Sequence, residues 1–172
     1  MEDLASYQVG TMHYSRILIA VDDDDFISSR RAFDYACTVA KIYNIPLGVA
    51  MVLETGDMNV FQSLSPETLS DWRENITRDL NTYCEKAREF GVLDVQPLLA
   101  EGNPGREIAE KLIPSFKPDL LVIGSETKSG RRKTLGTHAA YLARYASCSV
   151  IIVRSDAQGA AMIKDIKRDT AK

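Results

Sequence analysis

Five short apolar runs, separated by amphipathic or polar segments, dominate the pattern along the chain. They cover residues 17–21, 47–53, 95–100, 120–124 and 149–153. Most of them lack polar alternation, which is typical of strands that are buried on both faces of a parallel sheet. The run at 95–100 contains Pro97, which cannot donate a ladder hydrogen bond and therefore favours an edge position. The pattern predicts a five-stranded, mostly parallel sheet.

Helical periodicity fills most of the segments between these runs. The longest predicted helix begins at Ser65-Pro66-Glu67 and ends at Gly91, because proline suits a first helical turn and glycine a carboxyl-terminal stop. Strict alternation of strands and helices predicts right-handed crossovers, with helices on both faces of the sheet. Three more helices are predicted. One carries the apolar positions between Phe33 and Tyr43, and the other two cover residues 103–116 and 137–146.

Length predicts a single domain, since 172 residues can bury one full core. Residues 1–14 lack core-forming periodicity and are interpreted as a loose leader before a folded domain at 15–155. Residues 156–172 are polar and alanine-containing, so they form either a weak helix or a disordered tail.

Charge and cysteine usage exclude several classes of function. A net charge of −3 gives no general attraction to nucleic acid or to an anionic membrane, and the least polar stretch, residues 45–53, is too short to span a bilayer. The three cysteines form no CxxC pair, so neither a disulfide framework nor a zinc site is indicated. With no basic leader before an apolar segment, we expect a cytoplasmic protein. Only two histidines are present, which weakens most hydrolase interpretations.

The loop from Gly124 to Thr137 is the strongest candidate for an anion site. It leaves a buried strand and enters a helix, at the sheet edge where open α/β sheets bind ligands. Glycines at both ends allow close backbone approach, and the Thr137 hydroxyl lies at a predicted helix N-terminus. No Walker A or GxGxxG motif is present. A solvated charge run is the alternative interpretation of its basic residues, which are Lys128, Arg131, Arg132 and Lys133.

Other polar candidates carry weaker signals. Asp22 follows the first strand and could contact a ligand or a magnesium ion, whereas residues 23–25 are better explained as helix caps and solvated loop. His138 could touch a phosphate, although a surface histidine is the commoner case. Cys37 and Cys148 fall on core-facing positions and are interpreted as small hydrophobes.

Taken together, the segments 17–22, 119–124, 136–137 and 148–154 resemble the universal stress protein family, over about residues 14–155. The resemblance implies an adenine nucleotide α-hydrolase-like α/β fold, a single-domain open twisted five-stranded parallel sheet of order 3-2-1-4-5. It also implies a homodimer joined through the last strand. The residues agree with that dimer, since a fully apolar edge strand at 150–153 would leave its ladder unpaired without a partner.

Nucleotide-binding members of this family hold ATP in a loop of the form G-x2-G-x9-G-[ST]. Gly124, Gly136 and Thr137 match this pattern, Thr127 stands in place of the second glycine, and the interval to Gly136 is one residue short. Asp22 matches the family aspartate that contacts the nucleotide, and Val52 falls where the second strand meets adenine. The resemblance thus implies an ATP site, with Mg²⁺ as an accompanying ion, at Ala20, Val21, Asp22, Val52, Gly124, Ser125, Gly136, Thr137 and His138.

The interpretation that follows is a stress-response module that binds ATP or a related adenine nucleotide through a degenerate glycine loop. The altered loop leaves open a dimeric interaction protein that does not bind nucleotide. A nucleotide-hydrolysing enzyme is the third alternative. No nucleophile elbow, placed general base or adenylation loop rich in Ser and Gly is found, so we expect a protein that is not an enzyme.

Overall fold

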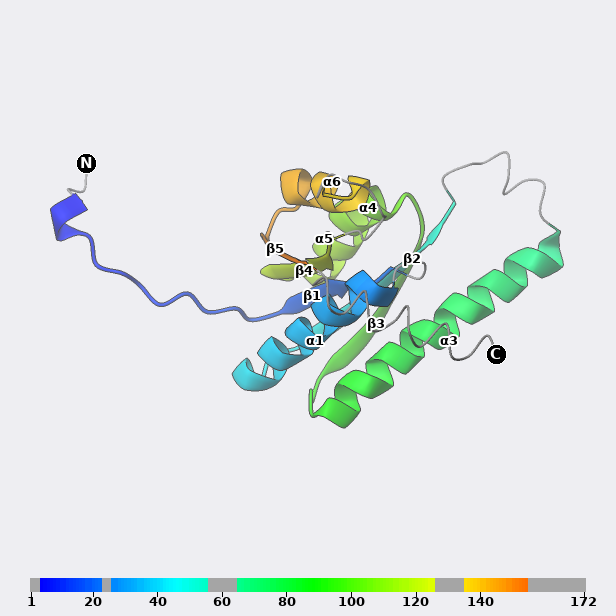
Figure 1. Cartoon of the computed structure of the whole chain (residues 1–172), viewed down its shortest axis with the longest axis horizontal. Helices are drawn as coiled ribbons and strands as arrows, with labels where there is room; N and C mark the ends of the chain where they lie inside the picture. Colours follow the sequence, from blue (N-terminus) through cyan, green and yellow to red (C-terminus); the bar gives the residue numbers. More distant parts are fainter. Residues whose placement is uncertain (1–3, 23–25, 56–64, 126–134, 155–172) are drawn as a thin grey trace, which may run out of the picture.

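The sheet has five parallel strands in the order β3-β2-β1-β4-β5 (Figure 1). The computed structural model describes residues 4–22, 26–55, 65–125 and 135–154. This sheet confirms the predicted fold and strand order, and it places the proline-containing strand at one edge. The strands are β1 (Ile17–Ala20), β2 (Leu47–Glu54), β3 (Val95–Gly102), β4 (Leu120–Gly124) and β5 (Ser149–Val153).

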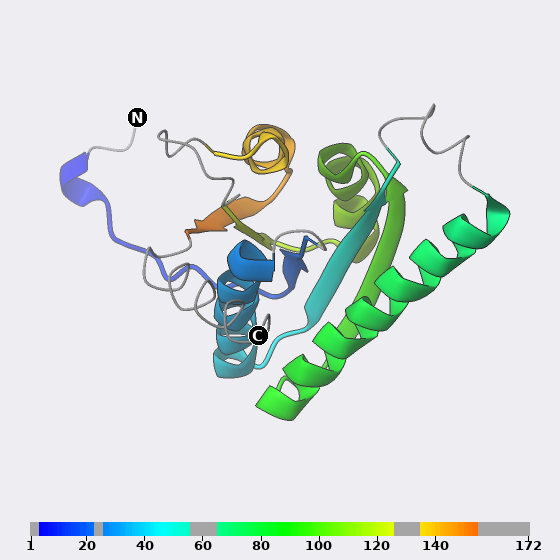
Figure 2. The ribbon, with the colours of Figure 1, turned by 45° about the vertical axis from the view of Figure 1, so that its right-hand side comes forward.

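Helices cover both faces of the sheet, as Figure 2 shows. One face carries α1 (Phe26–Tyr43) and α3 (Pro66–Phe90), and the other carries the segment 104–116 and α6 (Thr137–Tyr145). Ser65 caps α3 by accepting a hydrogen bond from the Thr68 N–H, and Gly91 ends that helix in the left-handed region, as predicted. The segment 104–116 comprises α4 (Pro104–Glu107), the π-helical turn η2 (Ile108–Leu112) and α5 (Ile113–Phe116).

Alternation along the strands divides the core into two layers. In β1, Ile17 and Ile19 pack toward α1 and α3, while Leu18 packs toward α5 and α6. All three side chains are fully buried, which is why β1 reads as an unbroken apolar run. The same alternation decides which residues at the end of each strand reach the α6 side of the sheet.

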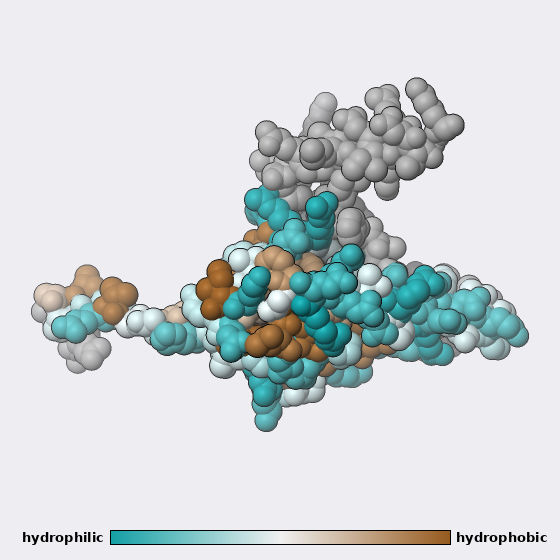
Figure 3. All heavy atoms as spheres, turned by 90° about the horizontal axis from the view of Figure 1, so that it is seen from below, coloured by the Kyte–Doolittle hydropathy of each residue, from teal (hydrophilic) through white to brown (hydrophobic). Residues whose placement is uncertain are grey.

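An extended arm precedes β1. It begins with the turn η1 (Leu4–Ser6), and side chains from Leu4 to His13 are exposed. Apolar side chains are visible at the tip of this arm in Figure 3, where Leu4 is exposed. The arm joins the domain at Ser15 and Arg16, whose N–H groups both donate to the Asp119 carboxylate.

Within the described ranges, the helices lack any segment with the length and apolar character needed to cross a membrane.

Candidate functional site

The carboxyl ends of β1, β2 and β4 lie side by side, because parallel strands end at the same edge of a sheet. Ala20 and Val52 both pack toward the layer that contains α6. Alternation places Glu54, two residues after Val52, on that same side. The predicted residues of the first two strands therefore lie on the same side of the sheet as α6.

The backbone at the end of β1 is fixed by two further contacts. The Val21 N–H donates to the Ala50 carbonyl at 3.0 Å. The Asp22 N–H donates to Ser29 Oγ at 2.8 Å, and the Ser29 hydroxyl lies 3.3 Å from the Asp22 carbonyl oxygen. Ser29 is buried, whereas Asp22 is exposed at the sheet edge. Sequence reasoning missed Ser29, because a serine inside a helix carries no signal of a tertiary contact.

The end of β4 holds the two residues predicted to start the anion loop. Gly124 is half-buried, and Ser125 is buried, with its N–H donating to the Val153 carbonyl at 2.9 Å. Thr127 and the four basic residues of the loop lie outside the described residues.

The start of α6 has the properties expected of an anion-binding terminus. Gly136 is the N-cap and is buried, and as a glycine it has no side chain to cap the helix. Its carbonyl accepts from the Ala140 N–H at 2.8 Å, so the first helical turn is formed. The amide groups of a first turn have no partner within the helix, and they lie at the positive end of the helix dipole. Thr137 is the first residue of α6, as predicted, and it is exposed.

A contact across the edge joins α6 to β2. His138 Nε2 lies 3.6 Å from Glu54 Oε1, and the two side chains are 39% and 58% exposed. Nearby, the Thr55 N–H donates to the Gly102 carbonyl at 3.2 Å, which ties the ends of β2 and β3 together. The sequence places Glu54 at this edge but assigns it no role, since its approach to His138 depends on the position of α6.

A metal site needs several ligating side chains that lie close together. Among the described residues, no group of three His, Cys, Asp or Glu side chains is placed to hold a metal ion.

Burial disfavours the thiolate form of the three cysteines. Burial raises the pKa of Cys37 to about 12, and it also raises the pKa values of Cys84 and Cys148. A thiol needs its thiolate form to react. Cys37 packs in the core, as predicted, and Cys148 is only half-buried.

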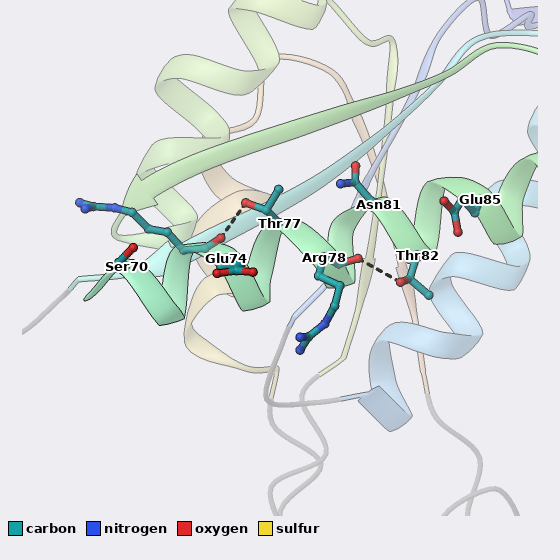
Figure 4. Close-up of a pocket in the computed structure, with 8 residues that line it drawn as sticks. Ser70, Glu74, Thr77, Arg78, Asn81, Thr82 and Glu85 are labelled. Carbon is teal, nitrogen blue, oxygen red and sulfur yellow. Dashed lines mark hydrogen bonds between the residues drawn. The ribbon is translucent and has the colours of Figure 1, made fainter. Parts of the chain in front are cut away.

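A surface groove lies away from this edge, along the outer side of α3 (Figure 4). Its lining residues all belong to that one helix and are polar or charged. Both threonines of this lining donate a hydrogen bond to the backbone of the helix itself. Thr77 Oγ1 donates to the Arg73 carbonyl at 2.6 Å, and Thr82 Oγ1 donates to the Arg78 carbonyl at 2.9 Å. None of the predicted site residues lines this groove, so it is not the candidate site.

The family assignment follows from a comparison of the whole domain. The family described as "Universal stress protein family" matches residues 13–154. This chain belongs to that family. A protein of Staphylococcus aureus (strain USA300), named as a universal stress protein, is 29% identical over 144 residues, which cover 83% of this chain and 86% of the relative.

Solved structures share the fold of this universal stress protein domain. The universal stress protein UspA from Lactobacillus plantarum has a TM-score of 0.71 at 20% identity, covering 84% of this chain and 100% of its own. A universal stress protein in complex with cAMP has a TM-score of 0.63 at 24% identity, with coverages of 83% and 99%. One from Archaeoglobus fulgidus in complex with dAMP has a TM-score of 0.57 at 21% identity, with coverages of 82% and 98%.

Proposed function

We propose that this universal stress protein binds an adenine nucleotide at the carboxyl edge of its sheet, with ATP as one candidate ligand. The observation that carries the proposal is the start of α6, where a buried Gly136, with no side chain to cap the helix, precedes the first turn. This terminus lies beside the ends of β1, β2 and β4, where open α/β sheets bind ligands. Backbone amides and a helix dipole together suit a phosphate group.

The predicted residues divide between the two parts of such a ligand. Ala20, Val21, Asp22 and Val52 would contact the base and ribose from the ends of β1 and β2. Phosphate would lie against the glycine loop and the first turn of α6, with Mg²⁺ bound through the phosphates where several are present. The residues on that side are Gly124, Ser125, Gly136, Thr137 and His138.

Two structural relatives support an adenine ligand, since one was solved with cAMP and another with dAMP. Both ligands contain adenine and a single phosphate. At 24% and 21% identity these relatives share the fold of this chain, and the ligand is carried over to it only as part of this proposal.

The protein acts in this proposal as a cytoplasmic binding and signalling module, and not as an enzyme. The protein is in this proposal a homodimer joined through β5, with a folded domain at 15–155 between the leader and the tail. The strand β5 supports this assembly, because it is a sheet edge whose residues are all only half-buried. An edge of this kind is completed most simply by a second copy of itself.

Isothermal titration with AMP and ATP tests the proposal. We expect binding to the wild type, and a loss of about fivefold in affinity for Thr137→Ala, the effect of one hydrogen bond of about 1 kcal/mol. Thr82→Ala on the outer side of α3 is the control and should bind as the wild type does. If millimolar nucleotide gives no binding and no small molecule is carried through purification, the chain is instead a dimeric interaction protein.

A further inference from the structure

We infer that Glu54 sets which adenine nucleotides this site accepts, by favouring a single phosphate over a polyphosphate chain. This inference rests on the proposed function and narrows it. It starts from the carboxylate that β2 places against the start of α6, with Glu54 Oε1 at 3.6 Å from His138 Nε2.

The fold directs Glu54 toward the phosphate side of the site. It is the last residue of β2 and follows Val52 on the face that carries α6. His138 is the second residue of α6, within the turn whose amides are proposed to hold phosphate. Glu54 ends β2 and His138 lies in α6, and these elements are far apart along the chain. Only the tertiary fold therefore brings the two side chains together.

The carboxylate supplies negative charge to a terminus that has no acidic residue of its own. The first turn of α6 contains neither Asp nor Glu, although acidic side chains stabilise such a turn. Glu54 contacts the His138 side chain of this turn from across the sheet edge. A phosphate bound at the first turn would therefore lie close to a carboxylate.

The strength of this competition depends on the charge of the ligand. A single phosphate can be accommodated beside Glu54, because the contact with His138 is partly exposed and such contacts are weak. Each further phosphate adds repulsion from the same carboxylate, since Coulomb energies sum over charges. Glu54 therefore affects mainly the difference between ligands of one and several phosphates.

The test measures the affinities of AMP and ATP for the wild type and for Glu54→Gln, at low salt and without Mg²⁺. The Gln variant keeps the shape of the side chain and removes its charge. We expect ATP affinity to rise about five- to tenfold and AMP affinity by a smaller factor. Added Mg²⁺ should shrink the gain for ATP, because the ion neutralises part of the phosphate charge.

Two further variants make the test specific to position. Glu85→Gln removes the same charge from α3 on the opposite face of the sheet, and it should leave the ratio of the two affinities unchanged. Glu54→Asp keeps the charge on a side chain shorter by one methylene and should fall between the wild type and the Gln variant.

The outcomes separate this inference from the function on which it rests. If both nucleotides bind but Glu54→Gln strengthens them equally, or leaves both unchanged, Glu54 has no selective role and the proposed function stands. If neither nucleotide binds the wild type or the Gln variant, the proposed function fails and the inference fails with it. If Glu54→Gln, and not Glu85→Gln, gains more affinity for ATP than for AMP, the result supports both the inference and the proposed function.

Discussion

A single carboxylate, Asp119, fixes the point where the amino-terminal arm joins the domain. Its Oδ2 accepts from the Ser15 N–H and hydroxyl, each at 2.6 Å, and its Oδ1 accepts from the Arg16 N–H at 3.1 Å. Partial burial raises the pKa of Asp119, but hydrogen bonds from Ser15 and Arg16 outweigh this and hold the pKa below its ordinary value. The ionised form is therefore favoured by folding.

Asp119→Asn should lower the free energy of unfolding at pH 7 by about 1.5 kcal/mol, the low end of the range for a hydrogen bond to a charged group. A depressed pKa stabilises the fold above the unfolded value and loses that contribution as the pH falls through the folded value. The difference between wild type and variant should thus shrink below about pH 4. Urea unfolding across this range measures it, with exposed Asp71→Asn as the control. A difference that is constant with pH would contradict the assignment.

At the scale of elements, close packing between β2 and α5 is decided at Gly48. A Cβ atom there would lie 2.9 Å from Phe116 Cε1 and 3.0 Å from the Cδ1 atoms of Leu18 and Leu98. These neighbours are core side chains from three different elements. The helix layer can approach β2 closely because this position carries no side chain.

Gly48→Ala should therefore destabilise the domain by about 1–3 kcal/mol, the usual cost of overpacking a filled core. Urea unfolding gives the value. Gly10→Ala is the matched control, since a Cβ at that position meets nothing within 4 Å. Equal stability of the two variants would show that the core around β2 can expand without cost.

Element positions could be predicted where burial dictates the sequence, and less well where it does not. The strands β1 and β4 are apolar runs because both faces are covered, and the pattern predicts them almost to the residue. The strands β2 and β3 extend beyond their predicted ends to Glu54 and Gly102, because parallel pairing between them continues through polar residues. Hydrophobicity carries no signal for such pairing.

The π-helical turn at 108–112 could likewise not be predicted from the spacing of apolar residues. It precedes Pro114, which lies in the first turn of α5 and has no N–H to donate. A change in helical winding just before a proline accommodates this loss without breaking the segment. The apolar positions still face the core, so the pattern predicts one helix where three segments are found.

At the scale of the whole molecule, the edge strand β5 bears on the proposed dimer. Its outer side lacks a strand partner within the described chain, and Ile151 and Ile152 pack only partly, on opposite faces of the sheet. A lysine at either position would place a charge in an apolar interface or core. Ile151→Lys and Ile152→Lys should therefore weaken the dimer.

Sedimentation velocity at micromolar concentration measures this effect. The wild type should sediment as a dimer and both lysine variants as monomers. Leu93→Lys, at a position that is already 83% exposed, should remain a dimer. A wild type that is monomeric under these conditions would rule out β5 as a stable interface.

The candidate site could be predicted only in part from the sequence. Asp22, Gly124 and Gly136 stand out because strand ends and glycine-bounded loops have sequence signals. The contact between Glu54 and His138 has none, since it joins two elements whose approach is set by helix packing. Residue types and spacing thus indicate the edge of the sheet, while the charge balance at that edge follows only from the fold.

The central claim is that an adenine nucleotide binds at this edge of the sheet, and amide shifts in ¹⁵N-labelled protein test it most directly. On titration with AMP, the account predicts saturable shifts at Asp22, Val52, Ser125 and His138. The amides of Thr77 and Thr82, along the groove on α3, should stay unmoved. Absence of shifts at millimolar AMP, or shifts confined to α3, would contradict the claim.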